Sequence, residues 1–298
     1  MAGSSVGYKS TRSMVSRALL NLFLSLMAIG CIIPFLIVIS SSLTDERSLI
    51  IDGYSIIPRK FSTLAYEFIA SDPTQIMKAY GVTVMVTVIG TCLSLLVSSC
   101  LAYALSRRDF PYRRKISLFI FITMLFNGGL VPTYILVAQV LRLKDTIWAL
   151  ILPYLIVPFF VLLLRTYFSE IPFSLIESAK IEGAGEFTIL FKVVLPLSLP
   201  AMATVGLFIV LQYWNDWYQA LLYITDASLN PLQYLLYLIM QNLDAIRLNS
   251  MQVMITQELP GENVRMAMAV LAMGPIIFAF MFVQKYFVSG LTIGAIKG

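Results

Sequence analysis

Histidine is absent from this chain of 298 residues, and charged residues make up only 12% of it. Without histidine the chain lacks the commonest general base and the commonest metal ligand, which excludes His-based catalytic triads and HExxH zinc sites. The three cysteines, Cys31, Cys92 and Cys100, lie inside apolar runs. They form no CxxC pair or disulfide framework, so we expect them to pack as small apolar residues.

A phosphate-binding GxxxxGK[ST] loop is also missing. The chain therefore has no recognisable means of holding a nucleoside triphosphate, and the sequence predicts no cofactor or metal bound by this chain. An enzyme would need a nucleophile and a base that converge on one site, and the sequence offers no convincing set.

Apolar residues are abundant instead: 59% of the chain is hydrophobic and the mean hydropathy is +0.85. This composition is typical of a membrane protein rather than a soluble domain. The net charge of +5 is explained by basic loops that set membrane topology, so we expect no nucleic-acid partner.

Six uncharged stretches are long enough to cross the hydrocarbon core as helices, which takes about 20 residues each. They are residues 18–44, 79–106, 116–141, 146–164, 193–215 and 266–284. The fold class is thus an all-α membrane protein with six transmembrane helices. A further stretch, 227–243, is interrupted by polar residues and is predicted to be an external or interfacial amphipathic helix.

Lysine and arginine counts predict the orientation, because basic residues in short loops resist translocation. With the N-terminus inside, 13 of the 21 basic residues fall on the inner side, and the dense group from Arg107 to Lys115 dominates that count. Both termini are therefore predicted to be cytoplasmic. The predicted organisation is a cytoplasmic segment 1–17, a first helix 18–44, an external segment 45–78, a core 75–288 with a large internal loop at 170–200, and a cytoplasmic tail 289–298.

The internal loop carries the most specific motif. It runs Glu177-Ser178-Ala179-Lys180-Ile181-Glu182-Gly183-Ala184 and continues to Val194-Leu195-Pro196 and Pro200. Pro172 can open a short helix, and the glycines permit a sharp bend between two helical pieces. Small side chains there let another backbone approach closely, so the pattern predicts a docking element that protrudes from the membrane. An ordinary amphipathic helix would not explain why Gly183 and the Leu195-Pro196 pair occur at these positions.

This loop resembles the EAA loop of ABC importer permeases, with Ser178, Glu182 and Val194 as small departures from the family pattern. The resemblance implies a type I importer (MetI-like) permease fold in the bacterial cytoplasmic membrane. It also implies that the loop couples the chain to a separate ATPase dimer, which binds ATP and Mg. The residues that inherit this role are Glu177, Ser178, Ala179, Glu182, Gly183, Ala184, Leu195 and Pro196. Further partners implied are a second, homologous permease and an extracytoplasmic solute-binding protein.

Two other segments indicate the branch of the family. Trp214-Asn215-Asp216-Trp217 resembles a signature of maltose-type carbohydrate permeases, and the Asn127 to Tyr134 segment is similar to the LplC-like oligosaccharide branch. The resemblance implies a sugar or oligosaccharide as substrate.

A sugar path needs hydroxyl partners and flat apolar ring faces. The candidates are Asn127, Tyr134, Gln212, Tyr213, Trp214, Asn215, Asp216 and Trp217. Asp216 has two readings: a charge that lines the path, or part of an interfacial aromatic belt. The break at Gly128, Gly129 and Pro132 either lines the cavity or allows close helix packing.

An ion-coupled secondary carrier of a small polar solute is the alternative from another class. A carrier of this size more often shows internal repeats, and none is evident in the sequence.

Overall fold

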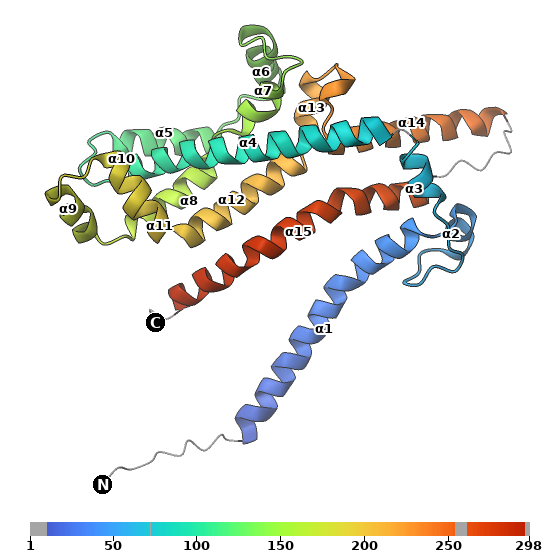
Figure 1. The fold of residues 1–298 in the computed structure, drawn as a ribbon, viewed down its shortest axis with the longest axis horizontal. Helices are drawn as coiled ribbons and strands as arrows, with labels where there is room; N and C mark the ends of the chain where they lie inside the picture. Colours follow the sequence, from blue (N-terminus) through green and yellow to red (C-terminus); the bar gives the residue numbers. More distant parts are fainter. Residues whose placement is uncertain (1–10, 72, 254–260, 296–298) are drawn as a thin grey trace. The chain divides into compact units, whose positions relative to one another are not determined.

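The computed structural model describes residues 11–71, 73–253 and 261–295, and all regular elements in these ranges are helices apart from one isolated bridge between Thr44 and Phe61 (Figure 1). The described residues form two compact units. Unit 1 contains the chain up to residue 71 together with 247–271, and unit 2 contains 73–246 together with the chain from 272 onwards.

Unit 1 contains α1 (Thr11–Ser42), α2 (Glu46–Asp52), α3 (Leu64–Ile69) and the first turns of α15 (Glu262–Ala295). The stretch Leu19–Ser42 is apolar and long enough to cross a membrane, and its large side chains are mostly exposed, as expected for a helix that faces lipid. The carboxylate of Glu46 accepts hydrogen bonds from the backbone N–H groups of Glu262 (2.9 Å) and Asn263 (3.0 Å), which caps the start of α15.

Unit 2 is built around α4 (Pro73–Ser106), which packs against α8 (Pro158–Ser169) and α12 (Leu199–Trp214) (Figure 1). The buried positions of α4 recur every three or four residues and are mostly small or hydroxyl-bearing, for example Gly90, Ser94 and Ser98. Many of its large apolar side chains, such as Met85, Val88 and Leu96, are exposed. This arrangement suits a membrane, where small residues let helices approach and apolar ones face lipid.

Gly90 of α4 lies directly against the ring of Tyr213 from α12. A Cβ placed there would lie 2.6 Å from Cζ of Tyr213, well inside van der Waals contact. Tyr213 cannot easily give way, because its side chain is 2% exposed and its hydroxyl donates to the carbonyl of Ile151 (2.9 Å) and lies 3.2 Å from the hydroxyl of Ser94.

We therefore expect Gly90→Ala to destabilise the protein by about 1–3 kcal/mol through overpacking. Gly81→Ala on the same helix is the matched control, because a Cβ at Gly81 meets nothing within 4 Å; this change removes a helix glycine and is expected to be neutral or slightly stabilising. The measurement is the melting temperature of each purified variant in detergent. Equal melting temperatures for Gly90→Ala and the wild-type chain would contradict this prediction.

Three of the predicted spans are broken helices. In the first, α5 (Arg113–Leu125) is followed by α6 (Leu130–Tyr134) and the π-helix η1 (Ile135–Val140), with a bend of 114°. Gly129 lies in the break with φ of 87°, a conformation that favours glycine. The predicted interruption of this span at Gly128 and Gly129 is thus confirmed, and its physical reason is backbone freedom.

The second broken span joins α7 (Ile147–Ile151) and η2 (Leu152–Tyr154) to α8 with a bend of 51°. The third leads from the internal loop into α12 with a bend of 87°. By length and composition, two helices in the described residues can cross a membrane, and up to five spans result if each bent pair counts as one. The sixth predicted span, 266–284, lies on α15, and the count of six stays a prediction.

The remaining elements of unit 2 are α13 (Tyr218–Tyr223), η4 (Ala227–Leu229) and the beginning of α14 (Leu232–Val253). The predicted amphipathic helix at 227–243 corresponds largely to α14. Its first turns pack on unit 2: Leu232 is fully buried, and its N–H donates to Thr83 of α4 (2.7 Å). Residues 1–10 and 296–298, which include most of the predicted N-terminal segment and the end of the predicted tail, lie outside the described residues.

Candidate functional site

The internal loop forms two short helices, α9 (Phe173–Ile181) and α10 (Glu186–Ile189), which we call the 173–189 segment. Pro172 immediately precedes α9, as predicted, where its missing N–H and fixed φ are tolerated. The turn after α9 closes with two hydrogen bonds, from Gly183 N to Lys180 O (3.0 Å) and from Ala184 N to Ala179 O (2.9 Å). These are the bonds of a Schellman motif, and Gly183 has the required positive φ of 83°.

Beyond α10 the chain passes through a π-helical turn, η3 (Leu190–Val194), and a single turn, α11 (Leu195–Leu197), before α12 begins. Pro196 and Pro200 lie in the first turns of α11 and α12, where a missing N–H costs nothing. The 87° bend falls between these two prolines. The Leu195-Pro196 pair of the sequence thus lies just before the corner where the chain leaves the internal segment and enters the span.

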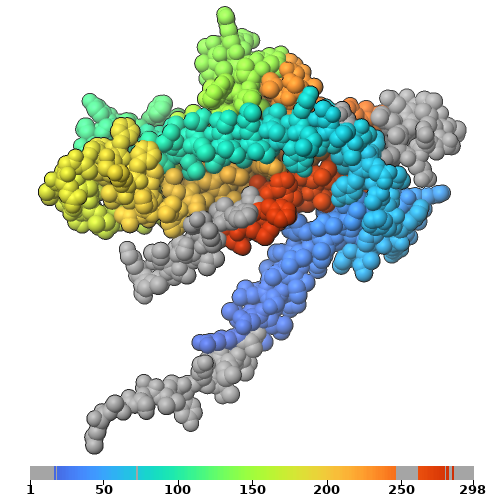
Figure 2. Space-filling view, in the orientation of Figure 1, coloured from blue at the N-terminus to red at the C-terminus, as the bar shows by residue number. Residues whose placement is uncertain are grey.

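The 173–189 segment lies at one end of unit 2, beyond the last turn of α4 (Figure 1), and its atoms form a tip of the surface (Figure 2, yellow). One face is anchored, since Ile176 and Ile189 are buried in the core of unit 2. Away from this anchored face, α9 exposes Glu177 and Ile181, and the side chain of Ile181 is 87% exposed. In α10, Phe187 is 74% exposed. Exposed apolar side chains on a protruding helix indicate a surface that binds another protein.

The predicted residues of this loop differ in exposure. Glu177, Ser178, Glu182 and Gly183 are exposed, whereas Ala179 and Ala184 are half-buried and pack against the core. Leu195 and Pro196 belong to the corner before α12. A Cβ at Gly183 would meet nothing within 4 Å, so within this chain glycine is required there by backbone conformation and not by crowding.

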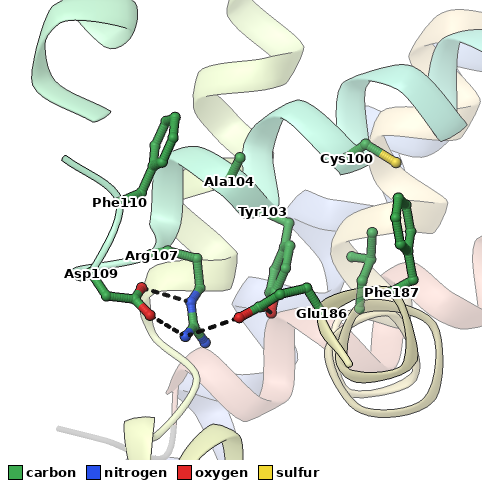
Figure 3. A pocket seen from close by; sticks show the side chains of 9 residues that line it. Cys100, Tyr103, Ala104, Arg107, Asp109, Phe110, Glu186 and Phe187 are labelled. Atoms are coloured by element: carbon green, nitrogen blue, oxygen red, sulfur yellow. Dashed lines mark hydrogen bonds and ion pairs between the residues drawn. The ribbon is translucent and has the colours of Figure 1, made fainter. Parts of the chain in front are cut away.

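Four charged side chains form a closed ring where the segment meets the end of α4. Figure 3 draws Arg107, Asp109 and Glu186 of this ring. Arg107 binds Asp109 through two hydrogen bonds (3.0 and 2.7 Å), and Lys180 lies 3.0 Å from Asp109. Lys180 also contacts Glu186 (2.9 Å), which lies 3.8 Å from Arg107. We call Arg107, Asp109, Lys180 and Glu186 the charge ring; positive and negative charges alternate around it.

Aromatic residues complete the surroundings of Arg107, whose side chain is 5% exposed. Its guanidinium carbon lies 5.7 Å from the ring centres of Tyr103 in α4 and of Phe173 at the start of α9. Such cation–π contacts hold a buried guanidinium where hydrogen-bond acceptors do not reach. Tyr103 in turn donates its hydroxyl hydrogen bond to Glu186.

The ring keeps its charges at neutral pH. The hydrogen bonds from Arg107 and Lys180 hold the pKa of Asp109 well below its usual range. Partial burial raises the pKa of Glu186, but hydrogen bonds from Tyr103 and Lys180 outweigh that effect and the net pKa is lowered. Hydrogen bonds to Glu186 and Asp109 raise the pKa of Lys180.

A cavity of about 390 Å³ adjoins the charge ring, between the end of α4 and α10 (Figure 3). Its lining residues outside the ring are mostly apolar: Cys100, Tyr103, Ala104, Phe110, Phe187 and Leu190. The segment is therefore not packed tightly against α4 on this side.

The residues proposed from the sequence for a sugar path fall into different environments. Tyr213 and Trp214 are buried in unit 2, and the indole N–H of Trp214 donates to the carbonyl of Ala272 in α15 (3.0 Å). Both side chains are thus held by protein groups. Gln212, their neighbour, is half-buried.

The next three residues are more accessible. Asn215 is exposed and its amide donates to Leu211 O of its own helix (2.9 Å). Asp216 accepts from the hydroxyl of Tyr154 (3.2 Å) and from Gln219 N (3.4 Å), so it ties the end of α12 to the start of α13. Trp217, 39% exposed, stacks on Tyr237 of α14 with ring centres 4.8 Å apart.

Asn127 and Tyr134 belong to the first broken span. Asn127 is exposed and its side chain accepts from Gly129 N (2.9 Å), which stabilises the break. Tyr134 stacks on Tyr223 of α13 with ring centres 5.7 Å apart. Nearby, the carboxylate of Asp145 accepts hydrogen bonds from Thr225 N, Thr225 Oγ1 and Asp226 N, which lowers its pKa and fixes the loop after α13.

Sequence reasoning missed the charge ring. It assigned Arg107 to a basic group that sets topology, and the neighbouring Arg108 is indeed exposed. Two signals pointed to a different role for Arg107. It directly follows the apolar run of α4, and Asp109 lies two residues away.

Residues 1–293 match the sequence model of a family described as the inner membrane component of binding-protein-dependent transport systems. The polygalacturonan/rhamnogalacturonan transport system permease protein YtcP of Bacillus subtilis (strain 168) is 41% identical over 276 residues, which cover 93% of this chain and 96% of the relative. Protein LplC of the same organism is 38% identical and covers 93% of each chain. A chain in the crystal structure of a bacterial ABC transporter that imports the acidic polysaccharide alginate is similar with a TM-score of 0.77, at 27% identity, covering 94% of this chain and 99% of that one.

Proposed function

We propose that this chain, which belongs to the family of binding-protein-dependent transport system inner membrane components, carries a sugar or oligosaccharide. The chain is a non-catalytic permease subunit of an ABC importer in the cell membrane. In this proposal, transport is driven by an ATPase that docks on the 173–189 segment. The names of the relatives support the substrate class. YtcP is named for polygalacturonan and rhamnogalacturonan, and the similar solved transporter imports alginate.

The observation that carries the coupling role is the exposed face of the 173–189 segment. Its helix presents Glu177 and Ile181 to solvent, its bend is fixed by the Schellman turn at Gly183, and its far end runs through η3 and α11 into the α12 span. A partner that moves this segment therefore acts on a span through a direct helical connection, which turns by 87° where α12 begins. The eight residues of the predicted EAA loop, from Glu177 to Pro196, have this role in the proposal.

The proposal includes the partners that an importer of this family implies. A separate ATPase dimer binds and hydrolyses the nucleotide, a second permease completes the path, and a solute-binding protein delivers the sugar. Alternating access then follows from ATP binding and hydrolysis, which favour different states of the permease pair.

The test is ATP-dependent uptake by the purified complex in proteoliposomes. The tagged chain is purified with its ATPase and second permease, the solute-binding protein is added, and labelled oligogalacturonides and maltooligosaccharides are compared. Uptake of a sugar that requires both ATP and the binding protein supports the proposal. An importer complex that transports neither class of sugar contradicts the substrate assignment, and uptake driven by an ion gradient without ATP contradicts the mechanism.

We also propose six spans with both termini in the cytoplasm, supported by the charge bias of the loops. Single cysteines placed in the 107–115 loop and near residue 185, in a chain whose three native cysteines are replaced by serine, are expected to react with impermeant maleimides only from the cytoplasmic side. A cysteine near residue 60 is expected to react from outside. Labelling of the 107–115 loop in intact cells would overturn this topology.

The proposal also includes a sugar path. It comprises Asn127, Tyr134, Tyr213, Trp214, Asn215, Asp216 and Trp217. Exposure favours Asn215 and Trp217 for direct contact with sugar, because the amide and part of the indole are accessible. Asp216 is half-buried, and its Oδ1 accepts from Tyr154 and Gln219 N. Tyr213 and Trp214 are buried, and their polar groups are hydrogen-bonded to other parts of the protein.

A further inference from the structure

Apolar packing alone leaves the orientation of the 173–189 segment loosely defined. Ile176 and Ile189 bury their side chains in the core, and such burial is favourable but non-directional. The cavity beside Phe187 leaves free space between the segment and α4 on one side. The burial of these two isoleucines therefore does not by itself define the angle between the segment and α4.

The charge ring supplies the directional contacts. The paired hydrogen bonds between Arg107 and Asp109 fix the guanidinium plane, since a bidentate pair adds geometric specificity. From this fixed plane, contacts reach both helices of the segment: Phe173 lies on the guanidinium face, and Glu186 lies beside Nη2. Lys180, near the end of α9, closes the ring onto Asp109.

We propose that the charge ring is the joint that holds the coupling segment in register with α4, with Arg107 as its positioning residue, so that movement of the segment is transmitted to α4 as well as to α12. The chain connection through η3 and α11 reaches only α12. The ring is a second, non-covalent connection, and it reaches the helix at the centre of unit 2. This inference rests on the proposed coupling function of the segment.

The position of Arg107 explains why a charged residue is buried at this place. A buried guanidinium is costly unless it is paired, and Arg107 has a bidentate carboxylate, a second carboxylate and two aromatic faces around it. Loss of the charge would leave Asp109 and Glu186 with Lys180 as their remaining partner in the ring. The segment would then stay bound to the core but lose its fixed angle to α4.

The experiment compares Arg107→Gln with Arg108→Gln in the reconstituted complex. Both changes remove one positive charge at adjacent positions, but Arg108 is exposed and lies outside the ring. The readouts are the amount of ATPase that co-purifies with the chain and the number of sugar molecules taken up per ATP hydrolysed. We expect Arg107→Gln to retain its ATPase while uptake per ATP falls roughly tenfold, the effect of about 1.4 kcal/mol of lost coupling. Arg108→Gln is expected to match the wild-type ratio.

Two further variants cover the case in which Arg107→Gln does not assemble. Lys180→Gln and Glu186→Gln change side chains that are 40% and 53% exposed, so neither leaves a deeply buried group unpaired. Each opens the ring, and each is expected to lower uptake per ATP by roughly threefold or more without loss of bound ATPase. A wild-type ratio in assembled Arg107→Gln, or in both of these variants, would overturn the proposed joint.

The outcomes separate this inference from the proposed function. If no ATPase co-purifies with the wild-type chain, the coupling function itself fails. If the wild-type complex couples ATP hydrolysis to uptake and the ring variants do so equally well, only the joint is wrong.

Discussion

Replacement of Gly183 by valine is expected to abolish sugar transport while the chain remains in the membrane. Gly183 adopts φ of 83° in the turn that ends α9. An L-residue in this region costs roughly 1–2 kcal/mol, and a β-branched one costs more. The Schellman bonds to Lys180 and Ala179 would open, and α9 would no longer meet α10 at the angle on which docking depends.

The control variants separate backbone strain from crowding. Asparagine tolerates a positive φ, so Gly183→Asn is expected to keep transport within about threefold of wild type although it adds a side chain. Gly185 has φ of −72°, an ordinary conformation, so Gly185→Ala is expected to behave as wild type. The measurement is uptake per unit of membrane-inserted protein, with the bound ATPase quantified. Equal loss in Gly183→Asn and Gly183→Val would show that close approach of the partner, and not the backbone conformation, is what requires glycine.

Removal of polar groups at the end of α12 is the second change with a large expected effect. We expect Asp216→Ala to lower uptake per assembled complex by about ten- to hundredfold, because a hydrogen bond between a sugar hydroxyl and a charged group is worth roughly 1.5–3 kcal/mol. Asn215 has a neutral amide, whose hydrogen bond is worth roughly 0.5–1.5 kcal/mol, so Asn215→Ala is expected to lower uptake about two- to tenfold. Asp216→Asn keeps an oxygen that can accept from Tyr154 and Gln219 N, and is expected to lie between wild type and Asp216→Ala.

Trp214→Ala is expected to act differently. Its indole is 6% exposed and donates to Ala272 O, so truncation leaves a cavity, removes this hydrogen bond and costs about 3–5 kcal/mol of stability. The amount of assembled complex should fall before transport per complex does. Asn242→Ala, which removes an exposed amide from α14, is the matched control for Asn215→Ala. Unchanged uptake per complex in both Asn215→Ala and Asp216→Ala would remove these residues from the sugar path and leave the importer function in place.

Local sequence patterns determined the parts of the fold that local chemistry controls. Backbone freedom at Gly129 and Gly183, and the missing N–H groups of Pro172, Pro196 and Pro200, mark the breaks and corners seen in the structure. The long apolar stretches, which are visible in composition alone, coincide with α1 and α4. The family was identifiable from the spacing of the EAA loop, because that spacing is fixed by a local helix and turn.

Tertiary structure alone decided which side chains meet. Arg107, which directly follows α4, and Glu186, at the start of α10, are 79 positions apart. A basic residue that pairs with a distant carboxylate looks the same in sequence as one that faces solvent. The sequence around Gly90 does not indicate that the side chain of Tyr213 packs against this glycine. The physical reason is that helical periodicity specifies which face of one helix is apolar or small, whereas the partner of that face depends on how helices far apart in the sequence pack together.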